Sequence, residues 1–287
     1  MSGEVPVRII GSIREMQTLA EGARGQGKTI ALVPTMGFLH TGHLSLMREG
    51  KKRGDLLVMS IFVNPTQFGA GEDYEAYPRD MKGDEHLAEQ AGVDVIFAPT
   101  AEEMYPAHYQ TYVSVEEVTR DLCGTSRPTH FRGVTTVVCK LFAIVKPHIS
   151  IFGEKDFQQL VAIRQMVSDL NLDVVIVGMP TYREEDGLAM SSRNTYLTPP
   201  ERTAALSIYK ALRVASALFG EGERRTEKII EVVQSMITAE PLARVDYVKV
   251  CDTKQLKTLG QIDREAVLAV AVRIGKARLI DNVVLNP

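Results

Sequence analysis

Short apolar runs alternate with segments of helical spacing through about the first 180 residues, and this alternation constrains the fold more than any other feature. The runs that we predict to be strands lie at residues 29–33, 56–63, 94–98, 149–152 and 174–177. The segments that we predict to be helices lie between them, at residues 44–52, 80–91, 134–145 and 157–170. Such alternation is typical of a parallel sheet covered by helices on both faces and joined by right-handed crossovers. The sequence therefore predicts an α/β fold with a Rossmann-like, doubly wound parallel sheet.

The pattern changes after residue 197. Pro199 and Pro200 open a long helical segment, at a position where the missing N–H of proline costs nothing. A second helix is predicted at residues 223–238, and strands follow at residues 245–251, 266–272 and 279–284. We therefore expect a smaller C-terminal α+β domain. The length suggests roughly two domains, at about 150 residues each. The change of pattern places them at residues 1–185 and 186–287, with residues 190–193 near the start of the second.

Charge and cysteine content argue against several classes of protein. The chain has 33 Lys and Arg against 36 Asp and Glu, a net charge of −3, which disfavours a broad nucleic-acid-binding surface. A few local donors could still bind a small phosphate-bearing ligand. Cys123, Cys139 and Cys251 lack the spacing of a disulfide framework or a zinc site. With neither a signal-peptide core nor an apolar stretch suited to span a membrane, we expect a cytoplasmic protein with reduced thiols.

Residues 22–29 match the phosphate-loop pattern G-x-x-x-x-G-K-[ST] letter for letter. That loop requires a strand before it and a helix after it, so that the helix N-terminus faces the phosphates. Here the order is reversed, because residues 13–20 are predicted to be helical and residues 29–33 extended. We interpret the match as a glycine-rich connection that caps the C-terminus of a helix.

Two histidines follow the first apolar strand, at the edge where open α/β sheets bind ligands. His40 and His43 are three residues apart at a predicted helix start, beside free backbone N–H groups and the positive end of the helix dipole. Gly42 between them would let a nucleotide approach closely. The pair alone could be structural or part of a metal site, but no third Cys or His ligand lies at a useful spacing.

The segment Gly153–Glu154–Lys155–Asp156 also follows a predicted strand and precedes a helix. Gly153 permits a close backbone approach, and Lys155 offers a positive charge to a phosphate. Asp156 could accept a hydrogen bond from a ribose hydroxyl, or it could simply cap the helix.

A third polar segment contains Met190, Ser191, Ser192 and Arg193, just before the long helix. Two hydroxyls and a guanidinium in a row could clamp phosphate oxygens. The alternative is an ordinary polar loop, and only its combination with the other clusters favours function.

A fourth cluster, at the end of the strand that contains Phe62, includes Asn64 and Gln67. A neutral amide can bind a hydroxyl or a carboxylate without carrying charge. A structural turn would explain the same residues. The glycines that follow could hinge a lid over residues 69–77.

Six strings occur in order between about residues 30 and 197: VPTMGFLHTGH, SIFVNPTQFG, YPRD, RPTHFRGV, FGEKDFQQL and DGLAMSSRN. H-x-G-H with a later serine loop is typical of class I adenylate-forming and nucleotidylyl-transfer enzymes. The complete set resembles the pantoate–β-alanine ligase family. The resemblance implies ATP-dependent condensation of (R)-pantoate with β-alanine through an enzyme-bound pantoyl adenylate. The implied products are pantothenate, AMP and diphosphate, in the last step of pantothenate biosynthesis.

The resemblance also implies roles for particular residues, with His43 as the proton donor. The implied catalytic residues are His40, His43, Lys155, Ser191, Ser192 and Arg193. The implied ATP-binding residues are Thr35, Met36, Gly37, His40, Gly42, His43, Gly153, Glu154, Lys155, Asp156, Tyr182, Met190, Ser191, Ser192 and Arg193. The implied substrate-binding residues are Phe62, Asn64, Gln67, Val137, Val138 and Gln159, although Phe62, Val137 and Val138 could be ordinary core. Mg²⁺ is expected on the ATP phosphates with no protein ligand assigned, and a homodimer without nucleic-acid or membrane partners is expected.

The residues themselves leave three alternative functions to consider. A nucleotidylyltransferase of the same superfamily would need extra Lys or Arg at its acceptor site, whereas Gln67 and Gln159 favour a small hydroxy-carboxylate. An aminoacyl-tRNA synthetase is disfavoured by the acidic balance and the short C-terminal part. A non-catalytic nucleotide sensor would be expected to have lost parts of the catalytic set, all of which this chain carries. Fold resemblance alone would not distinguish these functions.

Overall fold

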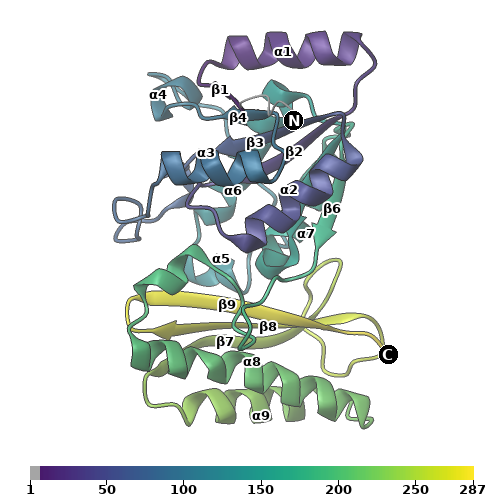
Figure 1. Ribbon diagram of the computed structural model, residues 1–287. Helices are drawn as coiled ribbons and strands as arrows, with labels where there is room; N and C mark the ends of the chain where they lie inside the picture. The colour runs from purple at the N-terminus through teal and green to yellow at the C-terminus, as the bar shows by residue number, and fades with distance from the viewer. Residues whose placement is uncertain (1–6) are drawn as a thin grey trace. The chain divides into compact units, whose positions relative to one another are not determined.

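A six-stranded parallel sheet forms the first part of the computed structural model, which describes residues 7–287 (Figure 1). The strands are β1 (Arg8–Ile10), β2 (Ile30–Thr35), β3 (Leu56–Ile61), β4 (Val95–Phe97), β5 (Ile149–Gly153) and β6 (Val175–Met179). Their order in the sheet is β1-β4-β3-β2-β5-β6, and every adjacent pair is parallel. The prediction of a doubly wound α/β sheet is confirmed. The short edge strand β1 was not predicted.

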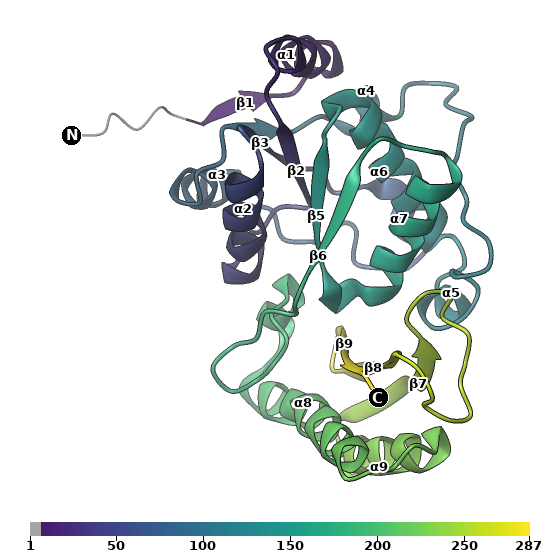
Figure 2. The same ribbon diagram turned by 90° about the vertical axis from the view of Figure 1, so that its right-hand side faces the viewer.

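Helices cover both sides of this sheet. They are α1 (Ile13–Gly25), α2 (Thr41–Arg53), α3 (Met81–Gln90), α4 (Ala101–Met104), α6 (His130–Val145) and α7 (Phe157–Asp169). Figure 2 shows α2 and α3 on one side of the sheet, and α6 with the C-terminal part of α7 on the other. The helix α5 (Cys123–Ser126) is a separate short turn.

The central strand β2 lies between β3 and β5, where the strand order changes direction. Residues Ile30, Ala31, Leu32 and Val33 are completely buried, as expected for a parallel strand with helices on both faces. The carboxyl end of such a strand is the topological switch point, where open α/β sheets bind ligands. The chain leaves this end directly into the two histidines.

The phosphate-loop match at residues 22–29 is a helix C-terminus, as the order of elements predicted. Helix α1 ends at Gly25, and Gly27 adopts a positive φ of 74° before β2 begins at Ile30. The backbone N–H of Lys28 reaches back to the carbonyl of Ala23. These bonds satisfy the terminal carbonyls of the helix.

The second part of the chain is a three-stranded antiparallel sheet with two long helices. The strands are β7 (Ala243–Asp252), β8 (Ala266–Ile274) and β9 (Ala277–Leu285), in that order. Helices α8 (Pro199–Gly220) and α9 (Thr226–Thr238) pack on one face, where Ile208, Ile229, Val250 and Val270 belong to one buried cluster. This arrangement confirms the predicted α+β character of the C-terminal part.

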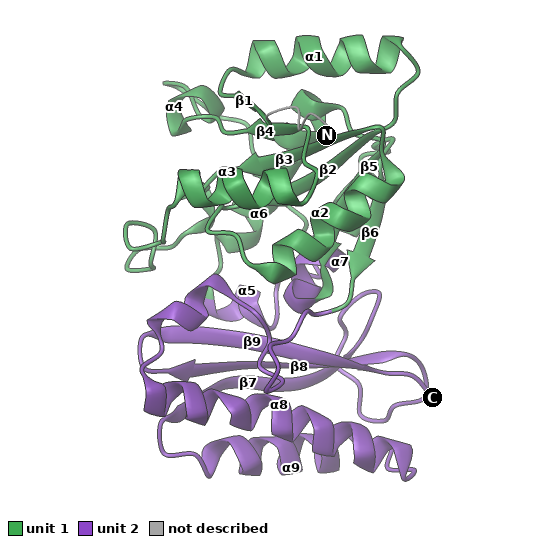
Figure 3. Cartoon of the chain, in the orientation of Figure 1, with its two compact units in different colours: residues 1–116, 127–154, 162–180 green, residues 117–126, 155–161, 181–287 purple. Residues whose placement is uncertain are grey.

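The contacts divide the chain into two compact units (Figure 3). Unit 1 contains residues 1–116, 127–154 and 162–180. Unit 2 contains residues 117–126, 155–161 and 181–287. Residues 1–6 of the first expected domain lie outside the described residues. Whether residues 1–185 and 186–287 are independent domains stays a prediction.

Candidate active site

The residues singled out in the sequence fall in both units. Unit 1 contains Thr35, Met36, Gly37, His40, Gly42, His43, Phe62, Asn64, Gln67, Val137, Val138, Gly153 and Glu154. Unit 2 contains Lys155, Asp156, Gln159, Tyr182, Met190, Ser191, Ser192 and Arg193.

The two histidines open helix α2 in unit 1. His40 is the N-cap residue, with an extended backbone, and its N–H donates to Nδ1 of His43 at 3.3 Å. The two imidazole rings stack, with centroids 3.9 Å apart and an angle of 23° between their planes. Because Nδ1 of a neutral His43 accepts this bond, its proton belongs on Nε2. His43 is therefore arranged as a hydrogen-bond donor through Nε2.

A buried carboxylate holds the turn that leads into these histidines. Asp84 of α3 accepts hydrogen bonds from the backbone N–H groups of Phe38 (2.8 Å) and Leu39 (2.6 Å). Gly37 and Phe38 have positive φ values of 80° and 50°, and the second is costly for a residue with a Cβ. Burial raises the pKa of Asp84, while the two N–H donors oppose that shift. Sequence reasoning missed Asp84, since its partners are backbone groups of a distant segment.

Thr35 supports the same turn from the end of β2. Its hydroxyl donates to the carbonyl of Ser60 at 2.7 Å and accepts from the N–H of Gly37 at 3.2 Å. The Thr35 hydroxyl is therefore used in holding the turn. Any contact of Thr35 with a ligand would be made by its backbone.

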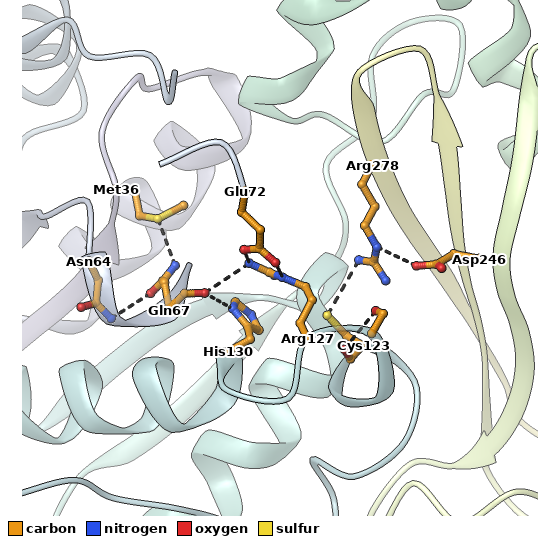
Figure 4. Close-up of polar contacts among 10 residues, drawn as sticks. Met36, Asn64, Gln67, Glu72, Cys123, Arg127, His130, Asp246 and Arg278 are labelled. Carbon is orange, nitrogen blue, oxygen red and sulfur yellow. Dashed lines mark hydrogen bonds and ion pairs between the residues drawn. The ribbon is translucent and has the colours of Figure 1, made fainter. Parts of the chain in front are cut away.

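The side-chain amide of Gln67 has a defined orientation (Figure 4). Its Oε1 accepts from Nδ2 of Asn64 at 3.2 Å, and its Nε2 donates to the sulfur of Met36 at 3.1 Å. A thioether is a weak acceptor. Gln67 can thus offer an amide N–H to a better acceptor, such as a hydroxyl or carboxylate oxygen.

Asn64 is committed to contacts within the protein. It is 1% exposed, and its Oδ1 accepts from the hydroxyl of Tyr105 at 2.8 Å. Its Nδ2 donates to the carbonyl of Gly133 at 3.1 Å as well as to Gln67. A side chain at Gly133 would overlap the carbonyl of Thr66, so this glycine lets α6 approach the turn closely. These contacts favour an orienting role for Asn64 over direct substrate contact.

The backbone carbonyl of Gln67 lies within hydrogen-bond distance of two side chains. It lies 2.9 Å from Nδ1 of His130 and 3.3 Å from Nη2 of Arg127 (Figure 4). Arg127 also forms a two-point ion pair with Glu72, with distances of 2.7 and 2.5 Å. Burial alone would raise the pKa of Glu72, but hydrogen bonding and charge from Arg127 hold it below its ordinary value.

The apolar residues expected around the substrate are all buried. Phe62, Val137 and Val138 are 7%, 6% and 4% exposed, and the Phe62 ring lies 6.2 Å from that of Tyr105. Their burial agrees equally with a place in the core of unit 1.

Lys155 and Asp156 lie in a short turn at the start of α7, within unit 2. The Lys155 ammonium is 3.8 Å from the Asp156 carboxylate, and the Lys155 side chain is 20% exposed. Gln159 follows on the first turn of the helix and is partly buried. In unit 1, a Cβ on Gly153 would meet no described heavy atom within 4 Å beyond its chain neighbours, so this glycine borders open space.

The serine segment of unit 2 is braced by a polar network. The Ser191 hydroxyl accepts from the N–H of Arg193 at 3.3 Å, and Ser192 is buried. Asn194 donates to Glu184 at 2.7 Å, and Arg202 bonds both Glu184 and Asp186. The sequence strings did not identify Arg202, because it lies 16 to 18 residues from these carboxylates along the chain.

Within residues 7–287, no group of three or more His, Cys, Asp or Glu side chains is placed to hold a metal ion. None of the helices in this range is long and apolar enough to cross a lipid bilayer. Cys123, Cys139 and Cys251 are free thiols.

The chain is similar to known proteins over nearly its whole length. The family model described as pantoate-beta-alanine ligase matches residues 8–284. A pantothenate synthetase from Syntrophus aciditrophicus is 57% identical over 276 residues, covering 96% of each chain. The crystal structure of pantothenate synthetase from Thermus thermophilus superimposes with a TM-score of 0.93 at 43% identity, covering 98% of this chain and 100% of that one. A pantoate–β-alanine ligase from Francisella tularensis, complexed with beta-gamma ATP and β-alanine, has a TM-score of 0.79 at 34% identity, covering 96% and 97%.

Proposed function

The chain belongs to the pantoate–β-alanine ligase family and condenses pantoate with β-alanine, and we propose that its H-x-G-H turn, Lys155 and residues 191–193 carry the ATP-dependent step. In that step the pantoate carboxylate attacks the α-phosphorus of ATP, and diphosphate leaves. The β-alanine amine then attacks the carbonyl of the pantoyl adenylate, which releases AMP. No covalent bond to the protein is needed, so the residues act by positioning and by stabilising charge.

Negative charge grows on the phosphoryl oxygens during adenylation. His43 would donate through Nε2 to these oxygens, because its Nδ1 accepts the backbone N–H of His40. Lys155 and Arg193 would hold the triphosphate by charge, and Ser191 and Ser192 by hydrogen bonds.

The nucleotide itself would contact a further set of residues. In this proposal the contacts are made by Thr35, Met36, Gly37, His40, Gly42, Gly153, Glu154, Asp156, Tyr182 and Met190, in addition to the charged and hydroxyl groups named above. Mg²⁺ would be carried on the ATP phosphates, where it would neutralise charge, and we assign it no protein ligand. The complex of the Francisella tularensis relative with beta-gamma ATP and β-alanine supports ATP as the nucleotide.

The orientation of the Gln67 amide is the observation that carries the substrate proposal. Asn64 donates to Oε1, and the acceptor that Nε2 contacts is the weak sulfur of Met36. Gln67 would therefore donate to an oxygen of pantoate, and Gln159 would bind the hydroxyl or the carboxylate. Phe62, Val137 and Val138 would surround the geminal methyl groups. Asn64 contributes by orienting Gln67.

A mixed anhydride such as the pantoyl adenylate is destroyed by water, so a cover over the intermediate is needed. We propose residues 69–77 as that cover. The ion pair between Glu72 and Arg127 ties this segment to the residues that precede α6. Residues 69–77 would close when Glu72 engages Arg127.

We further propose that the protein is a homodimer in the cytoplasm. Its free thiols agree with a reducing compartment. Sedimentation at micromolar concentration would give the mass of two chains, and the mass of one chain would contradict the dimer.

Two variants test the residue assignments by pantoate-dependent exchange between diphosphate and ATP. Gln67→Ala should raise KM for pantoate at least about tenfold and leave KM for ATP within about twofold. Ser192→Ala should raise KM for ATP at least about tenfold and leave KM for pantoate within about twofold. Gln234→Ala, an exposed glutamine on α9, is the matched control and should change neither constant. Equal changes in both constants for both variants would contradict the division of roles.

A further inference from the structure

One face of the unit 2 sheet carries a row of side chains that the proposed reaction does not use. The strand register places Lys249 of β7 opposite Ala269 of β8, and Ala269 opposite Asn282 of β9. Directly opposed residues share a face, and neighbours along a strand alternate. Asp281 therefore lies on the other face, which carries the buried cluster with α8 and α9.

Side chains of this row hold two earlier segments of the chain. Lys249 forms an ion pair with Asp121 at 2.5 and 2.6 Å. Arg278, on the same face of β9, approaches the sulfur of Cys123 at 3.8 Å (Figure 4). Nδ2 of Asn282 donates to the backbone carbonyl of Lys155 at 3.0 Å. These contacts explain why residues 117–126 and 155–161 group with unit 2 (Figure 3).

The two held segments are also bonded to each other through Gln158. Its Nε2 donates to the carbonyls of Val118 (3.0 Å) and Asp121 (2.8 Å), and its Oε1 accepts the N–H of Cys123 at 3.0 Å. Gln158 is 8% exposed. The backbone around Lys155 is thus fixed by Asn282 at one point and by Gln158 one helical turn later.

Asn282 is itself held rigidly. It is 7% exposed, and its N–H donates to Oδ1 of Asp281 at 2.8 Å. Asp281 binds the guanidinium of Arg183 in two places, at 2.6 and 2.9 Å. Arg183 donates onward to the carbonyl of Gly187, so adjacent residues of β9 hold both the Lys155 segment and the hairpin before residues 190–193.

We propose that Asn282 is a positioning residue for Lys155. By fixing the Lys155 carbonyl, it restricts the places that the ammonium can reach, and a cation placed in advance stabilises developing charge better than a mobile one. Small displacements of a charged group from its productive place cost rate and affinity. This inference rests on the proposed contact between Lys155 and the ATP phosphates.

A double-mutant cycle tests the coupling between the two residues. Asn282→Ala, Lys155→Ala and the double variant are compared by pantoate-dependent diphosphate–ATP exchange and by calorimetric binding of Mg²⁺ATP. Asn282→Ala should raise KM and Kd for ATP about tenfold and leave KM for pantoate within about twofold. In the Lys155→Ala background, the same change should alter ATP binding less than about twofold, because the group it positions is gone.

Controls separate this inference from general loss of stability and from failure of the proposed function. Val284→Ala, on the same face of β9 two residues further on and exposed, should behave as the parent protein. If Asn282→Ala does not fold, Asn282→Leu keeps the volume without the donor and should give the same cycle. The positioning role is overturned if the Asn282 change weakens ATP binding equally in the parent and Lys155→Ala backgrounds. It is also overturned if Asn282→Ala leaves KM and Kd for ATP unchanged. Parent-like ATP binding and exchange in Lys155→Ala would instead overturn the proposed role of Lys155.

Discussion

His43 has the local geometry that bears most directly on the adenylation step. Its Nδ1 accepts a hydrogen bond from the backbone N–H of His40, and the centroids of the two stacked imidazole rings are 3.9 Å apart. The turn before it depends on Asp84, which bonds two consecutive backbone N–H groups. A donor held by neighbouring backbone can stabilise charge without reorganising during the reaction.

Replacing His43 with alanine should lower the rate of pantoate adenylation by about 10²-fold or more, as for loss of a transition-state donor. KM for pantoate should change little, because His43 is not among the proposed pantoate contacts. The measurement is diphosphate–ATP exchange at saturating substrates. His86→Ala, an exposed histidine on α3, is the control. Unchanged exchange in His43→Ala would remove this residue from the mechanism.

Tyr105 affects the orientation of Gln67 through Asn64, which it holds by a hydrogen bond. Tyr105→Phe removes the donor to Asn64 and should raise KM for pantoate about fivefold, for loss of one buried neutral hydrogen bond of ~1 kcal/mol. Burial raises the pKa of Tyr105 to about 12, so the hydroxyl keeps its proton up to about pH 10. The ratio of KM values between variant and parent should therefore stay constant from about pH 7 to 10. A ratio that falls toward one within this range would contradict the argument.

At this scale, sequence motifs identify residues whose type is chemically distinctive, such as the two histidines, Lys155 and Gln67. Their roles are still proposals. Asp84 and Asn282 escape such reasoning, because each acts on backbone groups 45 or 127 residues away and no local pattern marks it. Only the fold brings them to their partners.

Among the elements, the turn at Pro65–Gln67 and helix α6 form the most closely packed pair around the proposed pantoate contacts. Gly133 permits the approach, and His130 at the first turn of α6 bonds the Gln67 carbonyl. The string RPTHFRGV therefore has a structural explanation, which is to hold the turn and, through Arg127, residues 69–77.

If the ion pair between Glu72 and Arg127 keeps residues 69–77 closed, breaking it should let water reach the pantoyl adenylate. Glu72→Gln should increase AMP release in the presence of pantoate and ATP but without β-alanine. The expected increase is about fivefold if the pair contributes ~1 kcal/mol to closure. Glu75→Gln, an exposed carboxylate of the same segment, should not increase it. An identical rate of AMP release in Glu72→Gln and the parent would contradict the closure role.

The pH dependence of this contact has a definite sign. Since the pKa of Glu72 is lowered in the folded protein, the ion pair is present above the ordinary value of 4.5 and is lost as pH falls through the lower, folded value. Retention of the adenylate by residues 69–77 should therefore not change between about pH 6 and 8.

The elements that the sequence predicted well are long or strongly apolar. Helix α6 and strands β2, β3 and β8 have continuous buried faces that a period of 3.6 or an apolar run reveals. The three-residue strand β1 and the four-residue helices α4 and α5 carry too few residues to show a period. They form because the surrounding structure supplies their partners.

For the whole molecule, the order of strands and helices predicted the parallel sheet and the change to α+β near residue 197, and the motif strings predicted the family. The membership of residues 117–126 and 155–161 in unit 2 was not predictable. It depends on Lys249, Arg278 and Asn282, which follow these segments by more than 100 residues. Such long-range side-chain contacts leave no periodic pattern in the sequence of either segment.

The most direct test of the whole account is exchange between labelled diphosphate and ATP in the parent protein, with and without (R)-pantoate and without β-alanine. Exchange is expected only when pantoate is present, because the carboxylate must form the adenylate before the reaction can reverse. Adding β-alanine should then convert the intermediate to pantothenate and AMP. Exchange that proceeds equally without pantoate would contradict this mechanism. A lack of exchange in folded protein that binds ATP, with pantoate present, would also contradict it.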